Sequence, residues 1–237
     1  MSRFPPTAKA VVAGWLLATV MLLGVPVSAR AASRQAATLT AGKAICDAAV
    51  THREATLSAL IAEVGAAPHV TQADKATLSA ALHSAAAGLQ ALKTSFDADR
   101  TLAQLRVDCR RIVTGFYVYL FLVPQVHLVA AADRVQSASG PLSDLAGLIG
   151  DQITAAAARG ENVSSAQGYD TDISTQLAAA EQAAATAAAT VVVLAASGYP
   201  GNRPTIESAR ASLGDAERDL AAAVSAASAA LAALKVA

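Results

Sequence analysis

Apolar residues recur at alternating spacings of four and three along most of this chain, a period that few folds can accommodate. Near the C-terminus Ile206, Leu213, Leu220, Ala227 and Leu234 recur every seven residues, with Ala209, Ala216 and Ala223 between them. Such seams are typical of long helices that pack closely and antiparallel. Aromatic residues, which favour strands, are only 4% of the chain. The sequence therefore predicts an all-α protein.

Glycines, prolines and capping residues divide the chain into about six expected helices. Thr71 and Asp74 have the spacing of a capping box, and Pro141 suits the first turn of a fourth helix that Gly160 ends. The expected helices cover residues 39–64, 71–98, 101–138, 141–160, a stretch from Ile173 to Leu194, and the seam after the turn-rich loop SGYPGNRPT. They predict an elongated, antiparallel, coiled-coil-like helical bundle.

Cys46 and Cys109 are the only cysteines, and their positions bear on the turn expected near residues 97–101. With that turn, and a first hairpin turn after Gly65, both sulfur atoms fall at the same height of a three-helix arrangement. If residues 71–138 formed one helix with a stutter, Cys109 would lie roughly 28 Å along that helix from the residue opposite Cys46, too far for a disulfide. We therefore expect a turn and a Cys46–Cys109 disulfide rather than two free thiols.

The N-terminal sequence predicts export. Arg3 and Lys9 precede an apolar run, and residues 29–31 read Ala-Arg-Ala, a cleavage pattern for a signal peptide. An uncleaved anchor is the alternative, because the run is nearly long enough to span a bilayer. The expected parts are a signal peptide (1–31) and a helical bundle (32–237), which comprises a disulfide-clamped three-helix part (32–139) and alanine-rich helices (140–237).

The charge of the mature chain argues against nucleic acid as a partner. Removal of residues 1–31 leaves 15 basic and 18 acidic residues, a net charge of −3. Both signs are scattered, so no basic stripe is available to neutralise phosphates.

The segment GFYVYLFLVPQVHLVAAADR, residues 115–134, concentrates aromatic residues and a proline. Its unbroken apolar run predicts a central helix that is buried on all sides. A membrane span or a buried strand fits less well, because polar residues follow the run and no partner strand is visible. Pro124 is expected to bend this helix. Alternatively, the opened turn lines a small-ligand pocket, for which the candidate residues are Tyr117, Tyr119, Pro124, Gln125 and His127.

Motifs for catalysis or metal binding are missing from the sequence. The four histidines lack the spacing of zinc ligands, and the two D-x-D pairs lack the glycine and glutamate of a calcium loop. No nucleophile elbow, P-loop or dinucleotide fingerprint occurs. We therefore expect a non-enzymatic protein without a cofactor or metal.

Two segments, YVYLFLVPQVHLVAAADR and SGYPGNRPTIESAR, resemble parts of uncharacterised exported helical proteins of actinobacteria. The resemblance implies a secreted or envelope location and no known activity. The expected function is that of a structural or protein-binding component of the bacterial cell envelope, with envelope proteins or a second copy as partners and no membrane span in the mature chain. The alternative is a carrier of a small apolar or aromatic ligand bound beside Pro124.

Overall fold

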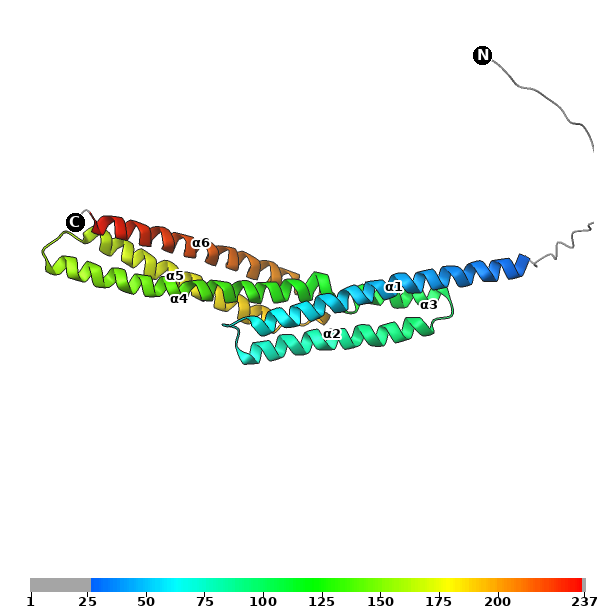
Figure 1. Ribbon diagram of the computed structural model, residues 1–237. Helices are drawn as coiled ribbons and strands as arrows, with labels where there is room; N and C mark the ends of the chain where they lie inside the picture. The colour runs from blue at the N-terminus through cyan, green and yellow to red at the C-terminus, as the bar shows by residue number, and fades with distance from the viewer. Residues whose placement is uncertain (1–26, 236–237) are drawn as a thin grey trace, which may run out of the picture. The chain divides into compact units, whose positions relative to one another are not determined.

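The computed structural model describes residues 27–235, which are almost entirely helical (Figure 1). No strand occurs in this described range, and the all-α prediction is confirmed. The six α-helices and two short turns, in chain order, are α1 (Val27–Ala66), α2 (Gln72–Ala98), α3 (Leu102–Thr114), the π-helical turn η1 (Val118–Leu122), α4 (Val123–Ala158), α5 (Ser164–Val192), the 3₁₀ turn η2 (Ala196–Gly198) and α6 (Arg203–Leu234).

The chain divides into two units, Met1–Thr38 and Leu39–Ala237, and every contact described below lies within the second unit. Most of the predicted signal peptide lies outside the described residues. In the first unit, residues 27–38 are helical as the start of α1, so this helix begins earlier than the expected residue 39.

Helix α2 begins and packs as its sequence predicts. The side chain of Thr71 accepts a hydrogen bond from the backbone amide of Asp74 at 3.1 Å, and its hydroxyl donates to the Asp74 carboxylate at 2.8 Å. This arrangement satisfies one of the free amides at the start of the helix. The buried face is the predicted stripe of Leu78, Leu82, Ala85, Leu89, Leu92 and Phe96.

Helices α1, α2 and α3 form the predicted three-helix arrangement, with a turn at residues 99–101. Helices α1 and α2 run antiparallel, because Lys75 contacts Gly65 whereas Lys93 pairs with Asp47. Likewise Ser95 on α2 donates to Asp108 on α3, and Gly88 lies against Phe116 just after α3. Cys46 and Cys109 lie at disulfide distance, with Cα atoms 5.7 Å apart. The predicted turn is therefore confirmed, and the expected cysteine pair is brought together.

The expected third helix is interrupted between Thr114 and Val118, a break that the sequence analysis did not predict. Tyr117 adopts a left-handed conformation (φ 46°) after Gly115, and η1 follows before α4 begins. The predicted bend at Pro124 is replaced by a helix start, because Pro124 is the second residue of α4. A proline is tolerated there because the first amides of a helix have no partner within it.

Pro141 does not begin a separate helix, and this prediction is wrong. Helix α4 continues through Pro141 to Ala158, so the expected boundary between residues 139 and 140 coincides with no helix end. Pro141 is exposed, so water can reach the carbonyl that its missing amide leaves free. The buried neighbour Ser139 donates to the Val135 carbonyl at 3.0 Å.

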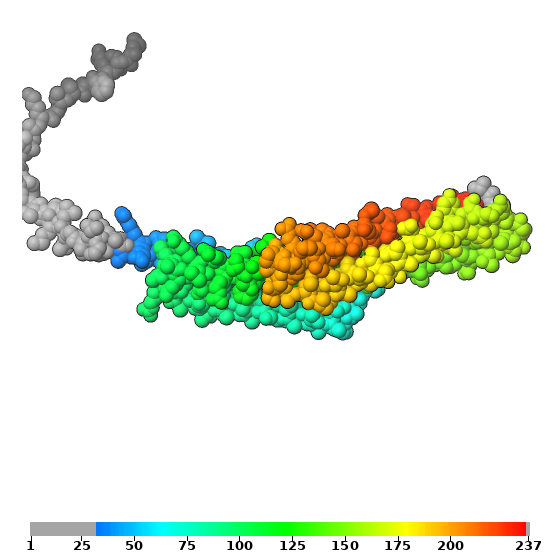
Figure 2. Space-filling view, turned by 180° about the vertical axis from the view of Figure 1, so that it is seen from behind, coloured from blue at the N-terminus to red at the C-terminus, as the bar shows by residue number. Residues whose placement is uncertain are grey.

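Helices α4, α5 and α6 lie side by side, and α5 and α6 pair along the alanine-rich seams (Figures 1 and 2). Ala180, Ala184 and Ala187 on α5 are buried. The buried residues of α6 are Ile206, Ala209, Leu213, Ala216, Ala223, Ala227 and Ala230, whereas Leu220 is half-buried. Small side chains at these positions allow the two helices to approach closely.

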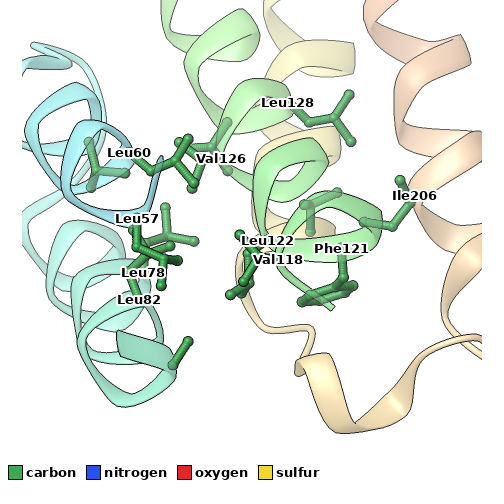
Figure 3. Close-up of a cluster of buried hydrophobic side chains, with 14 of the residues drawn as sticks. Leu57, Leu60, Leu78, Leu82, Val118, Phe121, Leu122, Val126, Leu128 and Ile206 are labelled. Atoms are coloured by element: carbon green, nitrogen blue, oxygen red, sulfur yellow. The ribbon is translucent and has the colours of Figure 1, made fainter. Parts of the chain in front are cut away.

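A core of leucine, valine and phenylalanine side chains joins the N-terminal helices to η1 and α4. Figure 3 shows Leu57 from α1 and Leu82 from α2 pointing toward Leu122, while Phe121 lies on the other side of η1. The expectation that this aromatic segment is buried on all sides is wrong. Tyr119 and Leu120 are 40% and 50% exposed, because no helix covers that side of η1 completely.

Candidate functional site

The five residues predicted for a pocket beside Pro124 do not converge on one cavity. Tyr119 and His127 lie against α1, Tyr117 lies against the loop before α6, and Gln125 points to the end of α5. Pro124 is half-buried at the start of α4.

The side chains of Tyr119 in η1 and His127 in α4 contact residues of α1. The Tyr119 hydroxyl lies 3.2 Å from the Thr56 hydroxyl, and the Arg53 guanidinium lies 5.1 Å from the Tyr119 ring centroid, a cation–π contact. His127 Nδ1 lies 3.3 Å from the Glu63 carboxylate, a salt bridge when the imidazole is protonated. Both contacts are on the surface, so they contribute modestly to stability.

Gln125 closes the C-terminus of α5. Its side chain is 2% exposed, and its Nε2 donates to the carbonyls of Val191 at 2.9 Å and Leu194 at 3.0 Å. Val191 is in the last turn of α5 and Leu194 lies just beyond it, where carbonyls have no partners within the helix. Gln125 therefore positions the loop that leads from α5 to α6.

The same loop carries Tyr199, whose ring centroid lies 4.8 Å from that of Tyr117. The two segments on which the resemblance rests therefore meet in space. Asn202 reinforces the loop by donating to the Ala195 carbonyl at 2.9 Å.

A cleft of about 440 Å³ opens beside Gln125, between α2 and the end of α5. Figure 2 shows this side of the molecule, where the loop before α6, α3 and η1, and α2 come together. The cleft is lined by Thr77, Ala81, Ser84 and Ala85 of α2, by Gly115, Phe116, Phe121, Leu122 and Gln125, and by residues 192–197. Of the five predicted pocket residues, only Gln125 lines it.

This cleft is one of four adjoining hollows, which we call the α2–α5 groove. The hollows measure about 480, 340, 440 and 480 Å³. Neighbouring hollows share lining residues, which in order along the groove are His69, Gln136 and Ala185, then Val192 and Val193, then Gly115 and Phe116. Val193, at the junction of two of these hollows, is 74% exposed.

Small side chains line the α2 wall of the groove. They are Thr77, Ala81, Ser84, Gly88, Ala91 and Ser95, again at four-three spacing. A Cβ atom at Gly88 would lie 2.3 Å from the Phe116 ring, so glycine is required for this ring to lie against α2. Leu92 also lines this wall but is buried, so the exposed side chains that α2 presents to the groove are small.

The hollow of about 340 Å³ contains a buried carboxylate. Asp133 is 6% exposed, and its Oδ1 accepts hydrogen bonds from the backbone amides of His69 at 2.6 Å and Val70 at 3.0 Å. These bonds hold the α1–α2 turn against α4. The second oxygen, Oδ2, accepts no hydrogen bond from residues 27–235.

Two acids lie near the α2–α3 turn, where Asp99 of the turn and Asp108 of α3 border a surface hollow. Desolvation, and then the neighbouring charge of Asp108, raise the pKa of the Asp99 carboxyl above its ordinary value, while Lys43 opposes this shift. Within the described part of the chain, no three His, Cys, Asp or Glu residues lie close enough to hold a metal ion.

No protein-family model, curated protein or solved structure matches this chain. Among the described residues, one stretch, Leu102–Ala158, is long and apolar enough to cross a membrane by length and composition. In the structure this stretch comprises α3, η1 and α4, and α4 packs against α5 and α6, as the core helix of a bundle does.

Sequence reasoning missed Asp133 and the small-residue wall of α2. An acid at the end of the apolar run LVAAADR was one available signal, because such an acid needs partners when it is buried. The other signal was a stripe of small residues beside the leucine stripe of α2, from Thr77 to Ser95.

Proposed function

We propose that this protein is an exported, non-enzymatic binding module of the cell envelope, whose α2–α5 groove receives an amphipathic helix of a partner protein. The observation that carries the proposal is the groove itself: adjoining hollows with small or apolar walls along helices of the same molecule. Helix-in-groove recognition requires such a surface, in which the partner's apolar face fills successive hollows.

The charges around the groove define the partner further. Asp74, Asp133 and Glu181 line the two hollows between the α1–α2 turn and α5, which form the α5 end of the groove. Arg111 of α3 lines the hollow at the opposite end. A complementary helix presents basic residues toward the α5 end and an acidic residue toward Arg111. Complementary charges of this kind fix the direction in which a helix docks.

Export is supported by the N-terminal signal pattern and by the cysteine pair at disulfide distance, since disulfides persist in oxidising compartments. The pairing of Leu102–Ala158 with other helices supports a core role for this stretch rather than a membrane span. A non-enzymatic role is supported by the lack of catalytic motifs in the sequence.

Photo-crosslinking in the native host tests the proposal. A photoreactive amino acid at Ser84, in the groove, is expected to capture a discrete partner, whereas the same amino acid at the exposed Ser225 of α6 captures none. Ala81→Arg, which places a long side chain in the groove, is expected to abolish capture. Ala80→Arg, also exposed on α2 but outside the groove, preserves it. Equal capture at Ser84 and Ser225, or capture unaffected by Ala81→Arg, would refute the proposal.

A carrier of a small apolar or aromatic ligand is the second candidate, favoured by the cleft beside Gln125. Phe116, Phe121 and Leu122 give this cleft an apolar wall, and its volume of about 440 Å³ is within the range of small-molecule sites. Native mass spectrometry of protein purified from its host tests this role. A bound small molecule that is lost in Ala81→Arg supports the carrier, and a ligand-free mass for the wild-type protein contradicts it.

A further inference from the structure

The hollow beside Asp133 has features of a built site that do not depend on a partner helix in the groove. It lies between the α1–α2 turn, α4 and α5, and its volume is about 340 Å³. Val129, Ala132 and Val192 form apolar walls, and Asp133 lies within it. A cavity of this size, with apolar walls and few polar groups, is at the small end of the range for small-molecule pockets.

The charge of Asp133 is not matched by a basic side chain. The salt bridges found among residues 27–235 do not include Asp133, and its two hydrogen bonds come from neutral backbone amides. Both bonds are made to Oδ1, and Oδ2 has no donor from the described chain. The buried polar atoms without a partner do not include Oδ2, so this oxygen is accessible from the hollow, where a cationic or donor group can approach it.

The other polar groups of the hollow favour a cation over an anion. Two carboxylates, Asp133 and Asp74, line the hollow, and no lysine or arginine does. Its remaining polar side chains are those of His69, Gln136 and Thr71. A metal ion requires more oxygen ligands than a single free carboxylate oxygen provides. A primary ammonium has three donors, which Asp133 and the neighbouring oxygen atoms can accept.

We infer that this hollow binds a primary ammonium group carried on a short apolar chain. The ammonium pairs with Asp133 Oδ2, and the chain lies against Val129, Ala132 and Val192. The same chemistry is found in a free alkylamine and in a lysine side chain of another protein. Where the ammonium belongs to a lysine side chain, the inference rests on the proposed function, because this hollow is part of the α2–α5 groove; where it belongs to a free amine, the inference stands apart from that function.

Titration by NMR with n-hexylammonium, followed through the amide signals of Ala132 and Ala188, tests the inference. Saturable shifts are expected with n-hexylammonium and not with n-hexanol, which has the same chain without the charge. Asp133→Asn is expected to weaken binding by about tenfold or more, because it removes a charge-assisted hydrogen bond and keeps an oxygen for the His69 and Val70 amides. Asp151→Asn, an exposed change on the same helix, leaves binding unchanged.

A second variant keeps the test valid if Asp133→Asn is poorly folded. Ala189 lines the hollow from its exposed edge, so Ala189→Leu fills the hollow without entering the core and is expected to abolish binding. Nα-acetyl-lysine N-methylamide serves as a second probe. If it binds like n-hexylammonium, the site accepts protein lysines; if only n-hexylammonium binds, the source is a free amine. Equal binding of n-hexanol, no saturable shift with either amine, or unchanged binding in both site variants would overturn the inference.

Discussion

Replacing Gln125 with methionine measures how strongly one side chain holds the end of α5. Methionine has a similar length and shape, so Gln125→Met removes the two hydrogen bonds to Val191 and Leu194 with little change in packing. The variant separates a structural role for Gln125 from a role in ligand binding.

The expected cost follows from what each carbonyl loses. The Val191 carbonyl also accepts the Leu194 amide at 3.1 Å, so it keeps a partner. The Leu194 carbonyl accepts no other hydrogen bond from residues 27–235, and it is left with at most a water molecule. The loss of the partner of a buried acceptor costs ~1–3 kcal/mol, and the Leu194 carbonyl is partly buried. We therefore expect a loss of ~2 kcal/mol, which lowers the melting temperature of a chain of this size by about 4–8 °C.

Calorimetry of Gln125→Met beside Gln136→Met provides the comparison. Gln136 is half-buried on the same helix and has no hydrogen bond with the described chain, so its replacement is expected to change the melting temperature little. Hydrogen exchange at the amides of residues 191–194 should accelerate in Gln125→Met alone. Equal melting temperatures for the two variants would refute the assignment of Gln125 as the residue that closes α5.

Four further predictions concern the clamp, the seam, the export signal and an acidic residue. Cys46→Ser is expected to cost ~2–5 kcal/mol in thermal unfolding while the circular dichroism spectrum stays helical, and a melting temperature equal to that of wild type would show that no bridge forms. Ala180→Leu, in the buried seam of α5, should cost ~1–3 kcal/mol by overpacking, whereas Ala179→Leu on the exposed face should be neutral; similar effects of both on denaturant unfolding would contradict the seam. Trp15 is the only tryptophan, so the exported protein should lack indole fluorescence, and its presence would indicate a retained anchor. Because the pKa of Asp99 is raised in the folded state, its ionised form disfavours folding. Asp99→Asn should therefore raise the melting temperature at neutral pH and have no effect in acid, where the carboxyl is protonated in both the folded and the unfolded state. The opposite pH dependence would contradict this prediction.

Local signals in the sequence predicted the helices that begin and end with recognisable residues. Thr71 and Asp74 specify the start of α2, and the cysteine pair specified the turn near Asp99 because helix length fixes the height of each residue. The positions of the loops alone predicted which residues of α1 and α2 lie opposite each other. The observed pair, Asp47 and Lys93, differs from that prediction by about one helical turn. Local patterns therefore sufficed wherever the neighbours along the chain determine the conformation.

The interior of the site could not be predicted, because contacts between distant segments determine it. Tyr117 occupies a left-handed conformation that non-glycine residues seldom adopt, and the contact of its ring with Tyr199 depends on a loop far along the chain. Pro141 resembled a helix start, but its exposed position on α4 allows the helix to continue. Gln125 lines a cleft, as expected of a pocket residue, but the sequence did not indicate its hydrogen bonds to the carbonyls of Val191, in α5, and Leu194, just beyond it.

The alanine seam between α5 and α6 also affects how the two helices find their alignment. A slide of one heptad, about 10 Å, would again place alanine against alanine over much of the seam, so these residues alone discriminate weakly between alignments. The larger side chains of Ile173, Leu177, Ile206 and Leu213 break this near-repeat, because each needs a space of its own size. Truncating these few residues to alanine should therefore produce molecules that retain full helicity but mix several alignments.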